Sequence, residues 1–169
     1  MIKIAFFDID GTLSAPCYPD GKGGLVIGFS VEGWETYCNA SDDEGYLSCG
    51  VITPVKEFAE SLAAQGTELF ILSAATYGSE KKAKRRFINE YYPSIFKECL
   101  FTDHENEKVP LILQMAADRG LLPENCLLVE DTYNTLLSAN DSGITSLHVS
   151  NIMAGNHIKL LSAKGVNIQ

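Results

Sequence analysis

Two aspartates lie two residues apart, directly after the first apolar segment of the chain. They are Asp8 and Asp10, in the run Asp8-Ile9-Asp10-Gly11-Thr12. A carboxylate held beside a cation can act as a nucleophile, and a nearby carboxyl with a raised pKa can protonate a leaving group. The pair is therefore suited to phosphoryl transfer onto an aspartate, followed by hydrolysis.

Polar residues follow three further apolar segments in the same way. Carboxylates gathered at one site repel one another unless a cation lies between them, and oxygen ligands with few histidines favour Mg²⁺. A serine and a lysine can hold phosphoryl oxygens and offset their charge. The residues concerned are Ser73 and Ala74, Thr102 to His104 with Lys108 shortly after, and Glu130, Asp131 and Thr132.

The elements that must position these residues alternate along the chain. Short, near-continuous apolar runs predict strands buried on both faces, at 3–7, 69–72, 99–101, 127–129 and 146–149. Helical patterns lie between or after them, at 54–65, 80–91, 110–119, 132–141 and within 154–164. This alternation predicts an α/β fold, a three-layer sandwich around a parallel, Rossmann-like sheet. In such a sheet, ligands bind at the carboxyl ends of the strands.

One segment interrupts this alternation. Residues 14–52 separate the first strand from the first helix, and these 39 residues far exceed a simple strand-to-helix loop of about 2–6 residues. The segment is rich in glycine and acidic side chains, and residues 25–29 and 46–52 have strand-like composition. We expect a single domain over 1–169 with a small β-rich flap at 14–52.

Composition excludes several other classes of protein. An apolar content of 46% excludes a disordered chain, and the net charge of −9 makes nucleic acid and anionic membranes unfavourable partners. No apolar run is long enough for a transmembrane helix, and no signal peptide precedes Asp8, so we expect a cytoplasmic protein. Five cysteines without a Cys-x-x-Cys pair predict reduced thiols.

The strongest basic cluster lies in the second predicted helix. Two interpretations remain open for it: a solvated helix face, or a strip that binds a phosphorylated polymer or nucleotide. Its members are Lys81, Lys82, Lys84, Arg85 and Arg86.

The four polar segments together resemble the motifs of the haloacid dehalogenase superfamily, in its phosphatase branch. The run from Phe6 to Leu13 resembles the first motif, and Leu72-Ser73-Ala74 resembles the second. Lys108 before an apolar helix is similar to the third, and Val129-Glu130-Asp131-Thr132 is similar to the acidic fourth. The resemblance covers the chain outside the flap, and each motif follows its own predicted strand.

This resemblance implies a role for each matched residue. Asp8 would be the nucleophile, Asp10 the acid and then the base, and Lys108 the lysine that steadies both Asp8 and the phosphate; Lys81 or Lys82 is an alternative for that lysine. The phosphate would be bound by Ser73, Ala74 and Thr12. Mg²⁺ would be held by Asp8, the Asp10 carbonyl and Asp131, with Glu130 as a further ligand or as a partner behind the ligands.

The function implied is a Mg²⁺-dependent phosphatase acting on a small phosphomonoester through an aspartyl phosphate. A nucleotide or a polynucleotide end is an alternative substrate, and a catalytically weak binding or scaffold protein is an alternative of another class. The flap is shorter than a full helical cap, so the site is either open to large substrates or covered by an oligomeric neighbour or by the flap itself.

Overall fold

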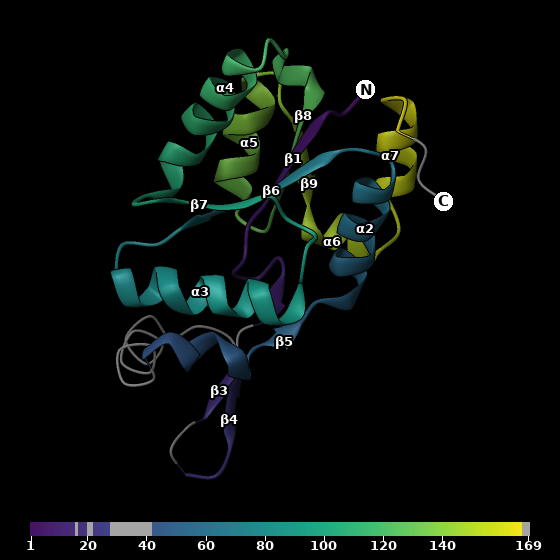
Figure 1. Cartoon of the computed structure of the whole chain (residues 1–169). Helices are drawn as coiled ribbons and strands as arrows, with labels where there is room; N and C mark the ends of the chain where they lie inside the picture. The colour runs from purple at the N-terminus through teal and green to yellow at the C-terminus, as the bar shows by residue number, and fades with distance from the viewer. Residues whose placement is uncertain (16, 20–21, 28–41, 167–169) are drawn as a thin grey trace.

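A five-stranded parallel sheet forms the centre of the protein (Figure 1). The computed structural model describes residues 1–15, 17–19, 22–27 and 42–166 of the chain. The strand order is β7-β6-β1-β8-β9, with β1 in the middle. The strands are β1 (Ile4–Phe7), β6 (Glu68–Ala74), β7 (Glu98–Thr102), β8 (Cys126–Glu130) and β9 (Thr145–His148). The predicted α/β fold and its five strands are confirmed.

Helices cover both faces of this sheet, because each strand carries apolar side chains on both. In β1, Ala5 and Phe7 belong to the core on one face, while Ile4 and Phe6 belong to the core on the other. Figure 1 shows α4 and α5 on one side of the sheet and α2, α6 and α7 on the other. Helix α3 contributes Phe87 to the same core as α2. The helices are α2 (Thr53–Ala64), α3 (Gly78–Tyr91), α4 (Lys108–Asp118), α5 (Tyr133–Asp141), α6 (Val149–Met153) and α7 (His157–Ala163).

The end of the chain differs from the prediction. Strand β9 ends at His148, and Val149 begins the short helix α6, which the sequence pattern did not predict. The His148 side chain accepts a hydrogen bond from the backbone N–H of Ser150, which caps this helix. None of the helices in the described part of the chain has the length and hydropathy that a bilayer crossing requires.

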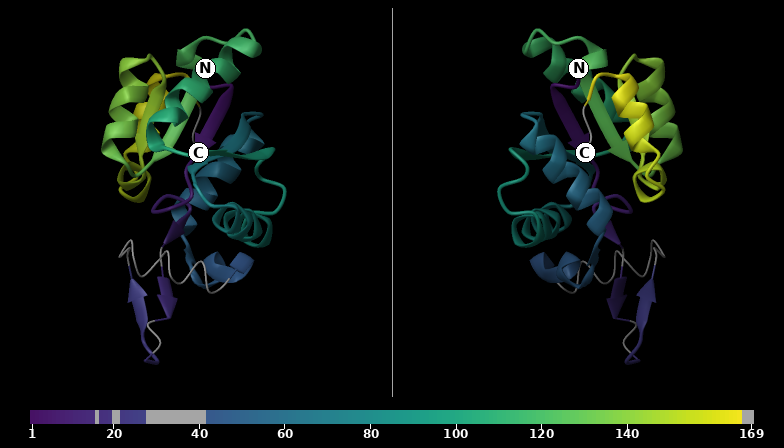
Figure 2. Two further views of the ribbon diagram at one scale, coloured as in Figure 1. Left: turned by 90° about the vertical axis from the view of Figure 1, so that its left-hand side faces the viewer. Right: turned by 90° about the vertical axis from the view of Figure 1, so that its right-hand side faces the viewer.

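The described residues of the segment between β1 and α2 form two small antiparallel pairs and a 3-10 helix. Strand β2 (Ser14–Ala15) pairs with β5 (Gly50–Val51), and β3 (Cys17–Pro19) pairs with β4 (Leu25–Ile27). Figures 1 and 2 show the β3–β4 hairpin projecting away from the sandwich. The 3-10 helix η1 (Asp42–Ser48) packs against α3.

The strand predicted over 46–52 is present only over Gly50–Val51, and its first three residues are helical instead. These residues belong to η1. Tyr46 is fully buried there, and its ring packs edge-on against the ring of Phe87, with the two ring centroids 6.4 Å apart. A helical turn carries that side chain inward, and only Gly50–Val51 extends into a strand. The strand predicted over 25–29 is present over Leu25–Ile27, and its last two residues lie outside the described residues.

Candidate active site

Asp8 lies at the carboxyl end of the central strand, beside a buried lysine. Its backbone N–H donates to the Val129 carbonyl at 3.1 Å, which continues the contact between β1 and β8 for one residue past the end of β1. Lys108, the first residue of α4, places its Nζ 3.0 Å from Asp8 Oδ1. Both side chains are buried. The lysine predicted from sequence to lie beside Asp8 is therefore in contact with it.

Lys108 is held by three carboxylates. Its Nζ also lies 2.7 Å from Glu130 Oε2 and 2.8 Å from Glu105 Oε2. Burial lowers the pKa of Lys108, but the charges of Asp8, Glu130 and Glu105 outweigh burial, so the net pKa is raised. Lys108 therefore stays protonated, and it carries fixed positive charge to the side chain of Asp8.

Glu130 uses both of its carboxylate oxygens within the protein. Oε2 accepts from Lys108, and Oε1 accepts from the backbone N–H groups of Asp131 and Thr132 at 3.1 and 3.2 Å. Burial and the charge of Asp8 raise the pKa of the Glu130 carboxyl, and the ion pair with Lys108 opposes that shift. Through these three accepted hydrogen bonds, Glu130 fixes Lys108 and the start of the following loop.

Three carboxylates come together in a group that could hold a cation. One oxygen from each of Asp8, Glu130 and Asp131 lies within 4.8 Å of the others. Gly11 has a φ of +69°, and a Cβ on it would collide with the Asp131 carboxylate, so the loop after Asp10 passes directly against Asp131. An all-oxygen set of donors fits Mg²⁺, which prefers such ligands. The residues present therefore fit the implied metal.

His148, which carried no functional indication in the sequence, lies directly behind Asp131. Its Nδ1 accepts from the Ser150 backbone N–H at 3.1 Å, so the neutral ring carries its proton on Nε2. That nitrogen lies 3.0 Å from the Asp131 carbonyl oxygen and donates to it. The histidine at the end of β9 thus supports the backbone of a candidate metal ligand.

Asp10 is held by two residues that sequence reasoning did not assign to the site. Its Oδ2 lies 2.7 Å from the Nζ of Lys84, and its Oδ1 accepts a hydrogen bond from the Tyr46 hydroxyl at 2.6 Å. Lys84 comes from α3 and Tyr46 from η1. Both are almost fully buried. Asp10 therefore has a lysine of its own, distinct from the lysine that contacts Asp8.

Lys84 is bound on every side. Besides Asp10 it contacts Glu80 Oε1 at 3.0 Å and donates to Ser73 Oγ at 3.1 Å and to the Ala74 carbonyl. Burial lowers the pKa of Lys84, but the charges of Asp10 and Glu80 outweigh burial and raise it. The interpretation of this basic cluster as a wholly solvated helix face is wrong for Lys84.

Among the described residues, the other lysines of that cluster form no ion pair with Asp8 or Asp10. Lys81, one of the two alternatives to Lys108, pairs with Asp103 at 3.1 Å on the surface. Lys82, the other alternative, is exposed. A signal for Lys84 exists in the sequence, because it falls on the apolar stripe of α3 next to Ala83, Phe87 and Ile88.

The three residues predicted to bind phosphate lie near the aspartates but are turned inward to different degrees. Ser73 is buried, with its hydroxyl on Lys84, and Ala74 is half-buried, with its carbonyl on the same lysine. Thr12 is fully buried, its backbone N–H donates to the Ile9 carbonyl, and its hydroxyl has no partner among the described residues. Ser73 and Ala74 therefore end β6 and share Lys84 with Asp10, whereas Thr12 follows Asp10 in the loop after β1 with its hydroxyl turned inward.

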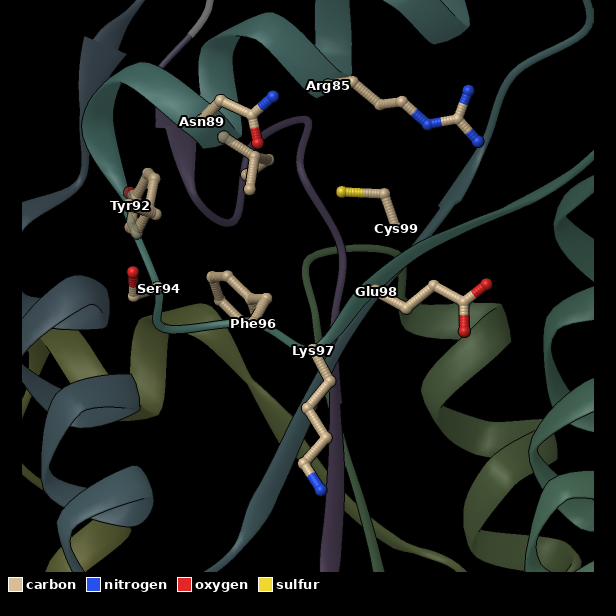
Figure 3. Close-up of a pocket in the computed structure, with 9 residues that line it drawn as sticks. Arg85, Asn89, Tyr92, Ser94, Phe96, Lys97, Glu98 and Cys99 are labelled. Carbon is tan, nitrogen blue, oxygen red and sulfur yellow. The ribbon is translucent and has the colours of Figure 1, made fainter.

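A hollow elsewhere on the surface does not coincide with this site. It lies at the start of β7, beside the second half of α3 (Figure 3). Figure 3 shows the head groups of Arg85, Lys97 and Glu98 directed away from its centre. The hollow is lined by Arg85, Ile88, Asn89, Tyr92, Ser94, Phe96, Lys97, Glu98 and Cys99. It lies at the opposite end of β7 from the candidate site.

Solved structures with a similar fold are known, although no family model and no curated protein sequence matches the chain. A haloacid dehalogenase-like hydrolase from Streptococcus pneumoniae is 20% identical, with a TM-score of 0.58 over 87% of this chain and 84% of its own. A haloacid dehalogenase-family enzyme from Bacteroides thetaiotaomicron, in complex with magnesium and inorganic phosphate, is 13% identical, with a TM-score of 0.54 over 88% and 94%. A longer hypothetical protein from Xanthomonas campestris, 18% identical with a TM-score of 0.47, is matched over 87% of this chain and 63% of its own length. The chain therefore has the haloacid dehalogenase-like fold.

Proposed function

We propose that the protein is a Mg²⁺-dependent phosphatase of the haloacid dehalogenase superfamily, which hydrolyses a small phosphomonoester through an aspartyl phosphate on Asp8. The observation that carries this proposal is the buried contact between Lys108 and Asp8, beside the oxygens of Glu130 and Asp131. A nucleophilic carboxylate needs positive charge beside it when it meets an anionic phosphate, and this arrangement supplies a lysine and a cation-binding group together.

In the first half of the reaction, an oxygen of Asp8 forms a bond to phosphorus. The bond from phosphorus to the substrate oxygen breaks, and its electron pair leaves on that oxygen. Asp10, protonated at this stage, gives its proton to the leaving oxygen, so the alcohol departs neutral. Lys108 offsets charge at Asp8 throughout.

In the second half, the aspartyl phosphate is hydrolysed. Asp10, now a carboxylate, takes a proton from water as the water oxygen bonds to phosphorus. The bond from phosphorus to Asp8 breaks, and its electron pair returns to the Asp8 carboxylate. The products are inorganic phosphate and an enzyme with the Asp8 carboxylate restored and the proton from water on Asp10.

We assign the metal to Asp8, Asp131 and the Asp10 carbonyl, with Glu130 behind them. Glu130 is better suited to that supporting place, because both of its oxygens already accept hydrogen bonds from the protein. Mg²⁺ bound there would neutralise charge on the phosphoryl oxygens. The Bacteroides thetaiotaomicron structure, which contains magnesium and inorganic phosphate, supports this choice of metal and ligand.

The test is the paired substitution of two aspartates. Asp8→Asn keeps the shape of the nucleophile and removes its charge, whereas Asp118→Asn changes an exposed residue at the end of α4 that accepts a hydrogen bond from Gln114. With p-nitrophenyl phosphate and Mg²⁺, we expect Asp8→Asn to lose at least about 10³-fold in kcat and Asp118→Asn to match the unmodified protein.

A binding or scaffold protein of the same fold would behave differently. A competent site should bind fluoroberyllate with Mg²⁺ as a phosphate analogue on Asp8, and this binding should raise the Tm of the unmodified protein but not of Asp8→Asn. Equal phosphate release by Asp8→Asn and the unmodified protein would refute the proposed function. So would the lack of any phosphatase activity together with an unchanged Tm.

A further inference from the structure

A residue of the inserted segment reaches into the candidate site. Tyr46 lies in η1, between β1 and α2, and its hydroxyl donates to Asp10 Oδ1 at 2.6 Å across 36 positions of sequence. The Tyr46 side chain is fully buried. Its ring lies edge-on to Phe87 of α3, and Lys84 Nζ lies 5.8 Å from the ring centroid. The hydroxyl is thus fixed by packing on α3.

The two oxygens of Asp10 have partners of different chemistry. Oδ2 contacts the ammonium group of Lys84, which can only donate. Oδ1 accepts from the hydroxyl of Tyr46, which can either donate or accept by turning its O–H bond. Tyr46 can therefore hold Oδ1 in place whether that oxygen carries a proton or not. Lys84 can hold only an oxygen that has none.

We propose that Tyr46 is a positioning residue for Asp10, through which the inserted segment sets the carboxyl that exchanges protons with substrate and water. This inference rests on the proposed function. Because Oδ2 is held by Lys84 and Oδ1 by Tyr46, the Asp10 carboxyl is restricted to one orientation. Holding a group in its reactive orientation before the reaction begins is a recognised source of rate enhancement.

A purely structural role for Tyr46 is the competing explanation. Tyr91 provides a matched control, because its hydroxyl also anchors η1 by donating to the Leu47 carbonyl at 3.1 Å. Each Tyr→Phe substitution deletes one hydroxyl. The hydroxyl of Tyr46 belongs to η1 itself, whereas the hydroxyl of Tyr91, in α3, donates to η1. Only Tyr46→Phe removes a contact with Asp10.

The leaving group of the substrate separates the two explanations. An alkyl phosphate expels an alkoxide that must be protonated, whereas p-nitrophenyl phosphate expels a stable phenolate that needs little help. We expect Tyr46→Phe to lower kcat about tenfold or more on glycerol 2-phosphate and less than about threefold on p-nitrophenyl phosphate, with KM unchanged on both. Tyr91→Phe should leave both values of kcat within about twofold. Asp10→Asn should show the same selectivity as Tyr46→Phe, only larger.

Each other result has a definite meaning. Equal losses on both substrates, or matching effects of Tyr46→Phe and Tyr91→Phe, would overturn the positioning role. If Asp10→Asn still showed selectivity for the leaving group, the proposed function would survive that outcome. If neither Asp8→Asn nor Asp10→Asn changed activity, the proposed function would fail, and the role of Tyr46 would fail with it.

Discussion

The ammonium nitrogen of Lys84 lies 2.7 Å from Oδ2 of Asp10, and the lysine side chain is almost fully buried. Lys108 makes the corresponding contact with Asp8, at 3.0 Å. The two lysines come from α3 and α4, which cover opposite faces of the sheet. Each aspartate of the pair after β1 therefore has a buried lysine of its own, supplied from a different layer of the sandwich.

The first prediction concerns Lys84. Lys84→Met removes the charge that neutralises Asp10 and Glu80 and leaves the Ser73 hydroxyl without its donor. Breaking a buried ion pair in this way costs about 3–5 kcal/mol, so we expect a loss of that size in the free energy of unfolding, measured by urea denaturation. Lys82→Met, on the exposed side of the same helix, should change it by less than about 0.5 kcal/mol. Equal stabilities of the two variants would contradict the buried network.

The convergence of candidate residues at one edge of the sheet could be predicted from the sequence, because the sequence predicts a parallel sheet. Parallel strands end at one edge, so residues that follow different strands, such as Asp8 and Asp131, converge although they are far apart in the chain. Continuous apolar runs marked those strands. Lys108 could be predicted for the same reason, because it begins the helix that follows β7.

The second set of contacts, around Asp10, could not be predicted in this way. Lys84 stands among four other basic residues; its place on the apolar stripe of α3 indicates burial, but only the tertiary packing brings its ammonium group to Asp10. Tyr46 belongs to an insertion whose 3-10 helix breaks the strand pattern, so its position relative to Asp10 depends on tertiary contacts. His148 lies inside the strand predicted over 146–149, whereas β9 ends at this residue, whose ring faces the Asp131 carbonyl.

A second prediction concerns the acceptor role of Glu130. In Glu130→Gln, the amide must direct its NH₂ group at either the Lys108 ammonium or the backbone N–H groups of the next loop, and both are donors. We expect a loss of about 3 kcal/mol in the free energy of unfolding. Glu105→Gln changes a half-exposed partner of the same lysine, so it should cost less than about 1 kcal/mol. Chemical denaturation of both variants in parallel measures the difference, and a larger cost for Glu105→Gln would reverse our assignment.

A third prediction concerns the metal. Removal of divalent ions with EDTA should abolish turnover of p-nitrophenyl phosphate, and added Mg²⁺ should restore it. Asp131→Asn takes a charge from the carboxylate group formed with Asp8, so we expect the Mg²⁺ concentration for half-maximal activity to rise at least about tenfold. The same substitution at Asp141, at the end of α5, serves as the control. An unchanged Mg²⁺ requirement in Asp131→Asn would place the metal elsewhere.

The last prediction concerns the close approach of Gly11 to Asp131. Gly11→Ala puts a methyl group where the Asp131 carboxylate lies, in a backbone conformation with φ +69° that disfavours side chains. Gly120→Ala provides a matched control, because Gly120 has a φ of +66° and open space around it. We expect Gly120→Ala to show only the backbone cost, about 1–2 kcal/mol in the free energy of unfolding, and to keep its Mg²⁺ requirement. Gly11→Ala should cost more and should also raise the Mg²⁺ concentration for half-maximal activity, because Asp131 must move. Equal stability losses in the two variants, with equal Mg²⁺ requirements, would show that Asp131 gives way without consequence and does not hold the metal.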